Sequence, residues 1–160
     1  MLDSNLKNAK ILIVDDHQPN IDLLEGYLQM QGFENILSTT DPVKTVELFN
    51  TYQPDLILLD LMMPKLSGYE VLEQLKPLMA PSVFWPVLVL TADISPNAKQ
   101  RALASGARDF LAKPFDFIEV FLRIRNLLET RYLYQQLEHK NQILEEKVAV
   151  LIKVMSGWNK

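Results

Sequence analysis

Cysteine is absent from this chain of 160 residues. No disulfide can form, and neither a thiolate metal site nor a cysteine nucleophile is possible. Long apolar runs are also missing. No segment approaches the roughly 18 apolar residues of a membrane-spanning helix, and the first ten residues lack the apolar stretch of a signal peptide. These absences favour a cytoplasmic protein without a membrane partner.

A strong charge of one sign is missing too, because the formal net charge is only −4. Neither the first 130 residues nor the last 30 form a strongly basic segment, so we expect no direct contact with nucleic acid. Hydrophobic residues make up 48% of the chain and charged residues 22%. This balance provides a real core for one domain of ordinary size, with some chain left for an extension.

Short apolar segments alternate with segments of helical periodicity. Five of the apolar segments have the length and β-branched content of buried strands, and they cover residues 10–14, 35–39, 56–59, 87–90 and 109–112. Asp41-Pro42 and Ser95-Pro96 each combine a capping side chain with a proline in the first turn of a helix. Val43, Val46, Leu48 and Phe49 are expected to supply the apolar contacts of the helix that Asp41 opens. The strand–helix order predicts an α/β fold, a doubly wound parallel sheet with helices on both faces.

Five polar residues at the ends of four predicted strands could together bind a ligand. They are Asp15, Asp16, Asp60, Thr91 and Lys113. In a doubly wound sheet the ligand site lies at the carboxyl ends of the strands, so we expect these side chains to meet. Three carboxylates repel one another unless a hard cation such as Mg²⁺ lies among them. A carboxylate can also attack a phosphoryl group, and a lysine and a hydroxyl can stabilise the charge of the acyl phosphate that forms.

These motifs resemble the receiver domain of bacterial two-component response regulators. The matching residues are Asp15-Asp16, Asp60, Thr91-Ala92 and Lys113-Pro114, together with the segment LLDLMMPKLSGYE around Asp60. The resemblance spans about residues 9–128, and it depends on the order and separation of the motifs. It implies a flavodoxin-like sheet of five strands in the order 2-1-3-4-5.

The resemblance also implies a role for each matching residue. Asp60 would be the phosphoacceptor. Mg²⁺ (or Mn²⁺) would be held by Asp15, Asp16 and Asp60 and by the backbone carbonyl of Met62. The phosphoryl-binding and switch residues would be Thr91, Ala92, Lys113 and Phe110. The peptide bond between Lys113 and Pro114 would be cis, which is inexpensive only before proline.

Two features depart from the family pattern. Phe110 occupies the position where the family often has a Tyr or His that rotates, and it has no hydroxyl to bond in an outward state. The stretch from Met79 to Pro86 is longer than is usual for the family, and the sequence assigns it no function.

The helical pattern continues beyond the expected end of the receiver at residue 128. An a/d heptad seam runs from Leu127 through Thr130 and Tyr134 to Met155, with its centre at Leu137, Asn141, Leu144, Val148 and Leu151. Asn141 at an a position and the charges of Lys140 and Glu145 suit a parallel two-stranded coiled coil. We therefore predict a receiver over 1–128, a coiled-coil signalling helix or linker over 129–160, and a parallel homodimer. The alternatives are a single helix folded against its own domain and a tail without its natural partner.

The leading hypothesis is a phosphorelay receiver and not an enzyme. Its phosphoryl donor would be a sensor histidine kinase or a phosphotransfer protein, and the C-terminal helix would act on an output module or partner protein. An enzyme of the haloacid-dehalogenase phosphatase type is the second hypothesis, although it requires an aspartate where Met62 stands. The third is a scaffold in which the coiled coil alone is active.

Overall fold

The computed structural model describes residues 2–80 and 83–158. Its five strands form one parallel sheet in the order β2-β1-β3-β4-β5, which confirms the predicted topology. Residues 81 and 82, in the stretch from Met79 to Pro86, lie outside the described residues. The strands are β1 (Lys10–Val14), β2 (Asn35–Thr39), β3 (Leu56–Asp60), β4 (Val87–Thr91) and β5 (Asp109–Ala112).

One predicted cap is confirmed at the start of α5, where the Ser95 side chain accepts a hydrogen bond from the backbone N–H of Ala98. Ser67 caps α4 in the same way, by accepting from the backbone N–H of Glu70, and this cap was not predicted from the sequence. Asp41 does the same, but its segment starts as a short 3-10 turn and leaves Val43 exposed, so the predicted core contact of Val43 is wrong. The helices are α1 (Ser4–Lys7), α2 (Gln18–Met30), α3 (Thr45–Tyr52), α4 (Gly68–Leu75), α5 (Pro96–Ala104) and α6 (Phe117–Trp158), with 3-10 turns η1 (Pro42–Lys44) and η2 (Lys76–Leu78).

Alternate residues of the central strands supply two apolar cores, one on each face of the sheet. Ile11, Ile13 and Leu58 pack with α1, α2 and α6. Leu12 and Leu59 point the other way and pack with α3, α4 and α5. Because β1, β3 and β4 are buried on both faces, their sequences are continuous apolar runs, as parallel strands require.

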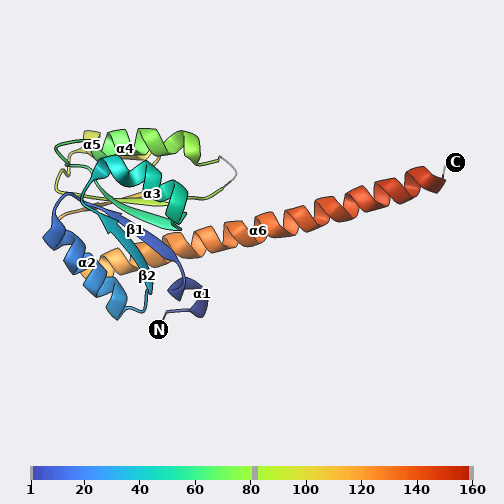
Figure 1. Ribbon diagram of the computed structural model, residues 1–160, viewed down its shortest axis with the longest axis horizontal. Coiled ribbons are helices and arrows are strands. Elements are labelled where there is room, and N and C mark those ends of the chain that lie inside the picture. The colour runs from blue at the N-terminus through green and yellow to red at the C-terminus, as the bar shows by residue number, and fades with distance from the viewer. Residues whose placement is uncertain (1, 81–82, 159–160) are drawn as a thin grey trace.

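The last helix, α6, is much longer than the sheet that it covers (Figure 1). At 1.5 Å per residue its 42 residues extend about 63 Å. Val120, Ile124, Leu128 and Arg131 are buried, whereas every residue from 132 to 158 is exposed. The helix therefore does not fold back along its own domain. The domain boundary at 128 stays a prediction, although Arg131 beyond it is buried.

The residues that the structure describes include no helix long and apolar enough to span a membrane.

Candidate functional site

Three aspartates converge at the carboxyl edge of the sheet. Asp15 and Asp16 follow β1, and Asp60 ends β3, the strand that pairs with β1. One oxygen from each of the three carboxylates lies within 4.8 Å of the others. Asp15 and Asp60 are buried and Asp16 is exposed, so solvent reaches the cluster mainly from the side of Asp16.

Lys113 reaches this cluster from the end of β5. Its Nζ atom lies 3.1 Å from Asp15 Oδ2 and 3.8 Å from Asp60 Oδ1. One ammonium group thus faces three carboxylates, and the site keeps an excess of negative charge. The Lys113–Pro114 peptide bond is cis, as the resemblance implied.

Backbone and amide groups orient the two buried carboxylates. Asp15 accepts hydrogen bonds from the backbone N–H of His17 at 2.9 Å and from the Asn20 side-chain amide at 3.2 Å. Asp60 accepts one from the backbone N–H of Met62 at 3.3 Å. Asn20 did not emerge from the sequence as a site residue. Its position in the first turn of the helix that follows Asp15-Asp16 is the signal that could have identified it.

The environment of Asp60 favours its neutral form. Burial is the main reason that the pKa of Asp60 is raised above its usual value, and the neighbouring charges of Asp15 and Asp16 add to the effect. Lys113 and the Met62 N–H act in the opposite direction but do not cancel it. Such a carboxylate gains from a cation that binds next to it.

The remaining predicted residues surround the same edge. Thr91 is fully buried at the end of β4, and its hydroxyl accepts a hydrogen bond from Asp93 N–H at 3.3 Å. Ala92, the next residue, is exposed. Phe110 on β5 is half-buried and packs with the α3–α5 core. Met62 has an exposed side chain, so only its backbone is held near Asp60.

Gly68 shapes the backbone next to Asp60. A Cβ atom added there would lie 2.5 Å from the Asp60 carbonyl oxygen and 2.7 Å from Leu61 Cα. Only glycine allows the start of α4 to approach the end of β3 so closely.

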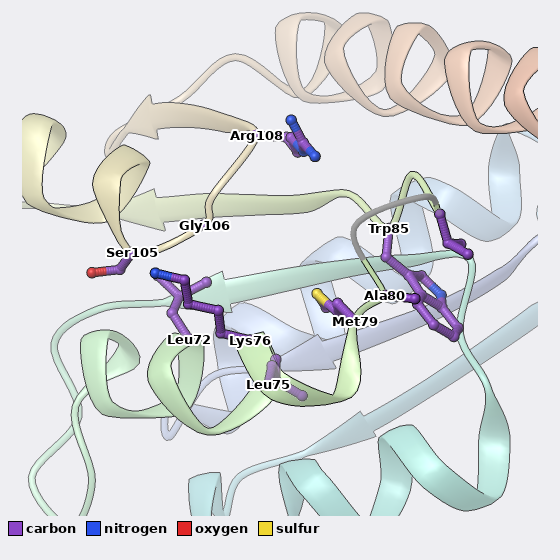
Figure 2. Close-up of a pocket in the computed structure, with 10 residues that line it drawn as sticks. Leu72, Leu75, Lys76, Met79, Ala80, Trp85, Ser105, Gly106 and Arg108 are labelled. Atoms are coloured by element: carbon purple, nitrogen blue, oxygen red, sulfur yellow. The ribbon is translucent and has the colours of Figure 1, made fainter.

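A separate cavity of about 290 Å³ lies away from the aspartates, between α4 and the turn before β5. Leu72, Leu75, Met79 and Trp85 form apolar walls, and Figure 2 shows Trp85 at the opposite end from Ser105. None of the aspartates lines it, so it is not part of the carboxylate site.

The chain is similar to known proteins in sequence and in fold. The response regulator receiver domain family matches residues 11–125. The chain is 34% identical over 144 residues to the alkaline phosphatase synthesis transcriptional regulatory protein PhoP of Bacillus subtilis, covering 89% of this chain and 58% of that protein. It is 36% identical over 143 residues to the DNA-binding dual master transcriptional regulator RpaA of Synechocystis, again covering 89% and 58%.

Among solved structures, the Francisella response regulator 1452 receiver domain is similar, with a TM-score of 0.70 and 30% identity over 77% of this chain and 98% of that one. The chain spans about half the length of the curated relatives it matches. Receiver domains are signalling modules that accept a phosphoryl group, and they are not enzymes in the ordinary sense. By its sequence match, its fold and its acidic edge, the chain belongs to the response regulator receiver domain family.

Proposed function

We propose that Asp60 is the phosphoacceptor of this receiver. The observation that carries the proposal is the convergence of Asp15, Asp16 and Asp60 within 4.8 Å, with Lys113 beside them. A carboxylate held in this way can attack a phosphoryl group, and the Lys113 ammonium can pair with the oxygens of the product. Thr91 would move so that its hydroxyl donates a hydrogen bond to the same oxygens, and the small Ala92 leaves room for the donor.

The donor set suits Mg²⁺, or Mn²⁺ in its place. Three carboxylates against one lysine leave unbalanced negative charge, and carboxylate and carbonyl oxygens are the ligands that hard cations prefer. Asp15, Asp16, Asp60 and the backbone carbonyl of Met62 would hold the ion. When bound, it supplies positive charge that offsets the repulsion between the carboxylates and the incoming phosphoryl group.

A labelling experiment tests the assignment. The parent chain should take up acid-labile phosphate from acetyl phosphate in the presence of Mg²⁺, and EDTA should stop the uptake. Asp60→Asn should abolish it. The matched control is Asp22→Asn, which changes an exposed aspartate on α2 outside the cluster. Undiminished labelling of Asp60→Asn would remove Asp60 from its role.

We further propose that the physiological donor is a sensor histidine kinase or a phosphotransfer protein, and that α6 carries the change to an output domain or partner protein. The support is the family itself together with the long exposed helix. The curated relatives extend well beyond the length that this chain spans, which is consistent with a receiver that acts on a further module.

The exposed part of α6 suits a parallel homodimer. Leu137, Leu144, Val148 and Leu151 are each 52–60% exposed although they are large and apolar. They share the a/d stripe of the heptad pattern, with Asn141 among them at an a position. A second copy of the helix would cover this stripe, and Lys140 would attract Glu145 of the other copy.

A further inference from the structure

One turn of α6 is tied to the receiver by charge and hydrogen bonds, in contrast to the apolar packing before it. Arg131 is only 7% exposed. Its Nε donates to Asp55 Oδ1 at 2.9 Å, and its Nη1 donates to the Phe84 carbonyl at 2.7 Å. The guanidinium also lies over the Trp85 ring, 5.1 Å from its centre. A buried arginine with these partners is held in one orientation, because its planar donors point in fixed directions.

The partners of Arg131 are themselves anchored to the sheet. Asp55 uses its second oxygen to accept the backbone N–H of Lys10 at 2.8 Å, at the start of β1. Trp85 donates its indole N–H to the Pro54 carbonyl at 2.7 Å and packs edge-on against Phe49, with ring centres 4.7 Å apart. Asp55 therefore links Arg131 to the start of β1, and Trp85 links it to α3 and to the residue before Asp55.

Tyr134, one turn further along α6, adds an aromatic contact. Its ring stacks on Phe84, with centres 5.2 Å apart and planes inclined by 17°. The Arg108 guanidinium also lies 5.0 Å from the Phe84 ring centre. Tyr134 is an a position of the predicted seam, so its ring is already used within the chain and the seam left for a second copy starts at Leu137.

The loop that carries Phe84 and Trp85 is the stretch to which the sequence assigned no function. Trp85 also forms the end wall of the cavity in Figure 2. Asp55 directly precedes β3, and Phe84 and Trp85 precede β4. These three residues therefore lie at the amino edge of the sheet, opposite the aspartates. In contrast, α6 begins just after Lys113-Pro114 at the carboxyl edge.

We propose that Asp55, Phe84 and Trp85 form a clamp that grips α6 at Arg131 and Tyr134 and fixes the rotation and tilt of the helix relative to the sheet. Apolar contacts alone would let the helix turn or slide by small amounts, whereas the paired hydrogen bonds of Arg131 do not. The clamp matters for output because 27 residues of α6 follow Arg131. At 1.5 Å per residue they extend about 40 Å, so a tilt of about 10° at the clamp moves the far end by about 7 Å.

The consequence for signalling depends on the proposed function, but the clamp itself can be measured without phosphorylation or dimerisation. Because the chain has no cysteine, spin labels can be attached at two introduced cysteines without a background. Glu73 on α4 and Glu146 on α6 are exposed and lie outside the clamp, and Glu146 is at an f position away from the seam. Pulsed electron resonance on labelled chains diluted into excess unlabelled chain reports only the distance within one molecule.

The parent should give one narrow distribution of distances, and Arg131→Met should broaden it at least twofold. Arg125→Met is the matched control, because Arg125 on the same helix pairs with Glu129 and lies over Phe121, both within α6. It should leave the width unchanged. A folded Arg131→Met variant with the parental width would overturn the clamp, and so would equal broadening in both arginine variants.

A second variant covers the case in which Arg131→Met does not fold. Tyr134 is 50% exposed, so Tyr134→Ala removes the stack on Phe84 while leaving Arg131 in place. Broadening supports the clamp, and an unchanged width rejects it. Phosphate uptake at Asp60 is measured on the same samples and should survive in every clamp variant. If the parent takes up no phosphate, the proposed function fails while the distance measurement still decides the clamp.

Discussion

At the scale of single residues, the aspartate cluster suits phosphoryl chemistry but lowers the stability of the folded chain. Asp60 is buried beside two other carboxylates, and its pKa is raised above the value it has in the unfolded chain, mainly by burial. The folded state therefore binds a proton at Asp60 more readily than the unfolded state does. Stability is lost as the pH rises through the two pKa values, and the ionised Asp60 lowers the free energy of unfolding at neutral pH.

Asp60→Asn should accordingly raise the free energy of unfolding at pH 7 in the presence of EDTA, because the amide is neutral. The gain over the parent should shrink as the pH falls below the range where Asp60 titrates, since both side chains are then uncharged. Urea unfolding at pH 7 and at successively lower pH values provides the measurement. Mg²⁺ should stabilise the parent more than the variant, because binding to the folded state shifts the equilibrium. A variant less stable than the parent at pH 7 would contradict this account.

Gly68 gives a second prediction at this scale. In Gly68→Ala the new Cβ would meet backbone atoms of Asp60 and Leu61, which cannot move aside as a flexible side chain could. We expect a loss of about 1–3 kcal/mol in the free energy of unfolding, together with slower phosphate uptake. Gly26→Ala is the control. Gly26 lies inside α2 with nothing within 4 Å of the added atom, so alanine should stabilise the chain by about 0.5–1 kcal/mol. Similar effects of the two changes would argue against a special role for Gly68.

At the scale of elements, the sequence was most informative where local signals agreed. The predicted strand over 109–112 coincides with β5, and β1 and β2 also match, because short apolar runs with sharp ends have few alternatives. The four-residue helix α1 was not predicted. It is held by the burial of Leu2 and Leu6 against the core that includes α6, a tertiary contact with no periodic signature.

Contacts between distant residues were the part that the sequence did not reveal. Asp55 and Arg131 are 76 residues apart, and neither belongs to a motif. The aspartate cluster was predictable only because parallel strands bring their carboxyl ends to one edge. No comparable rule places an arginine of α6 beside the loops at the other edge, so the clamp required the structure.

The exposed part of α6 provides the prediction at this scale. Leu144→Lys should convert a dimer into a monomer, because a lysine at a d position would be buried in the apolar seam without a partner. Glu146→Lys is the matched control, since it introduces the same residue at an exposed f position. Sedimentation equilibrium at several concentrations distinguishes the two states, and both variants should still take up phosphate. A monomeric parent at high concentration, or a dimeric Leu144→Lys chain, would show that the coiled-coil interpretation is wrong.

At the scale of the whole molecule, α6 connects the two edges of the sheet. It starts four residues after Lys113, which contacts the aspartates, and it leaves past Asp55 and Phe84 at the opposite edge. Five residues of β-strand separate these edges by about 17 Å. A change at the carboxyl edge can therefore reach the exposed helix through one continuous element. The clamp decides whether that change rotates the helix as a unit.

The extent of the folding unit is the last prediction. The sequence set the receiver boundary at 128, whereas the clamp extends the folded unit to Tyr134. A chain that ends at residue 128 loses Arg131 and Tyr134, which leaves Asp55 and the Phe84 carbonyl without these partners and uncovers the Trp85 ring. Because a hydrogen bond to a charged group contributes about 1.5–3 kcal/mol, the 1–128 chain should be less stable by that order.

The matched comparison is a chain of residues 1–136, which keeps the whole clamp and removes most of the seam. It should unfold in urea with the same free energy as the full chain measured at low concentration, where dimers dissociate. It should also take up phosphate at the parental rate, because the aspartates and Lys113 are unchanged. If the 1–128 and 1–136 chains proved equally stable, the boundary at 128 would be correct and the contacts of Arg131 would add nothing to folding. A deficit confined to the 1–128 chain would place the end of the receiver within α6, at the turn that holds the helix to the sheet.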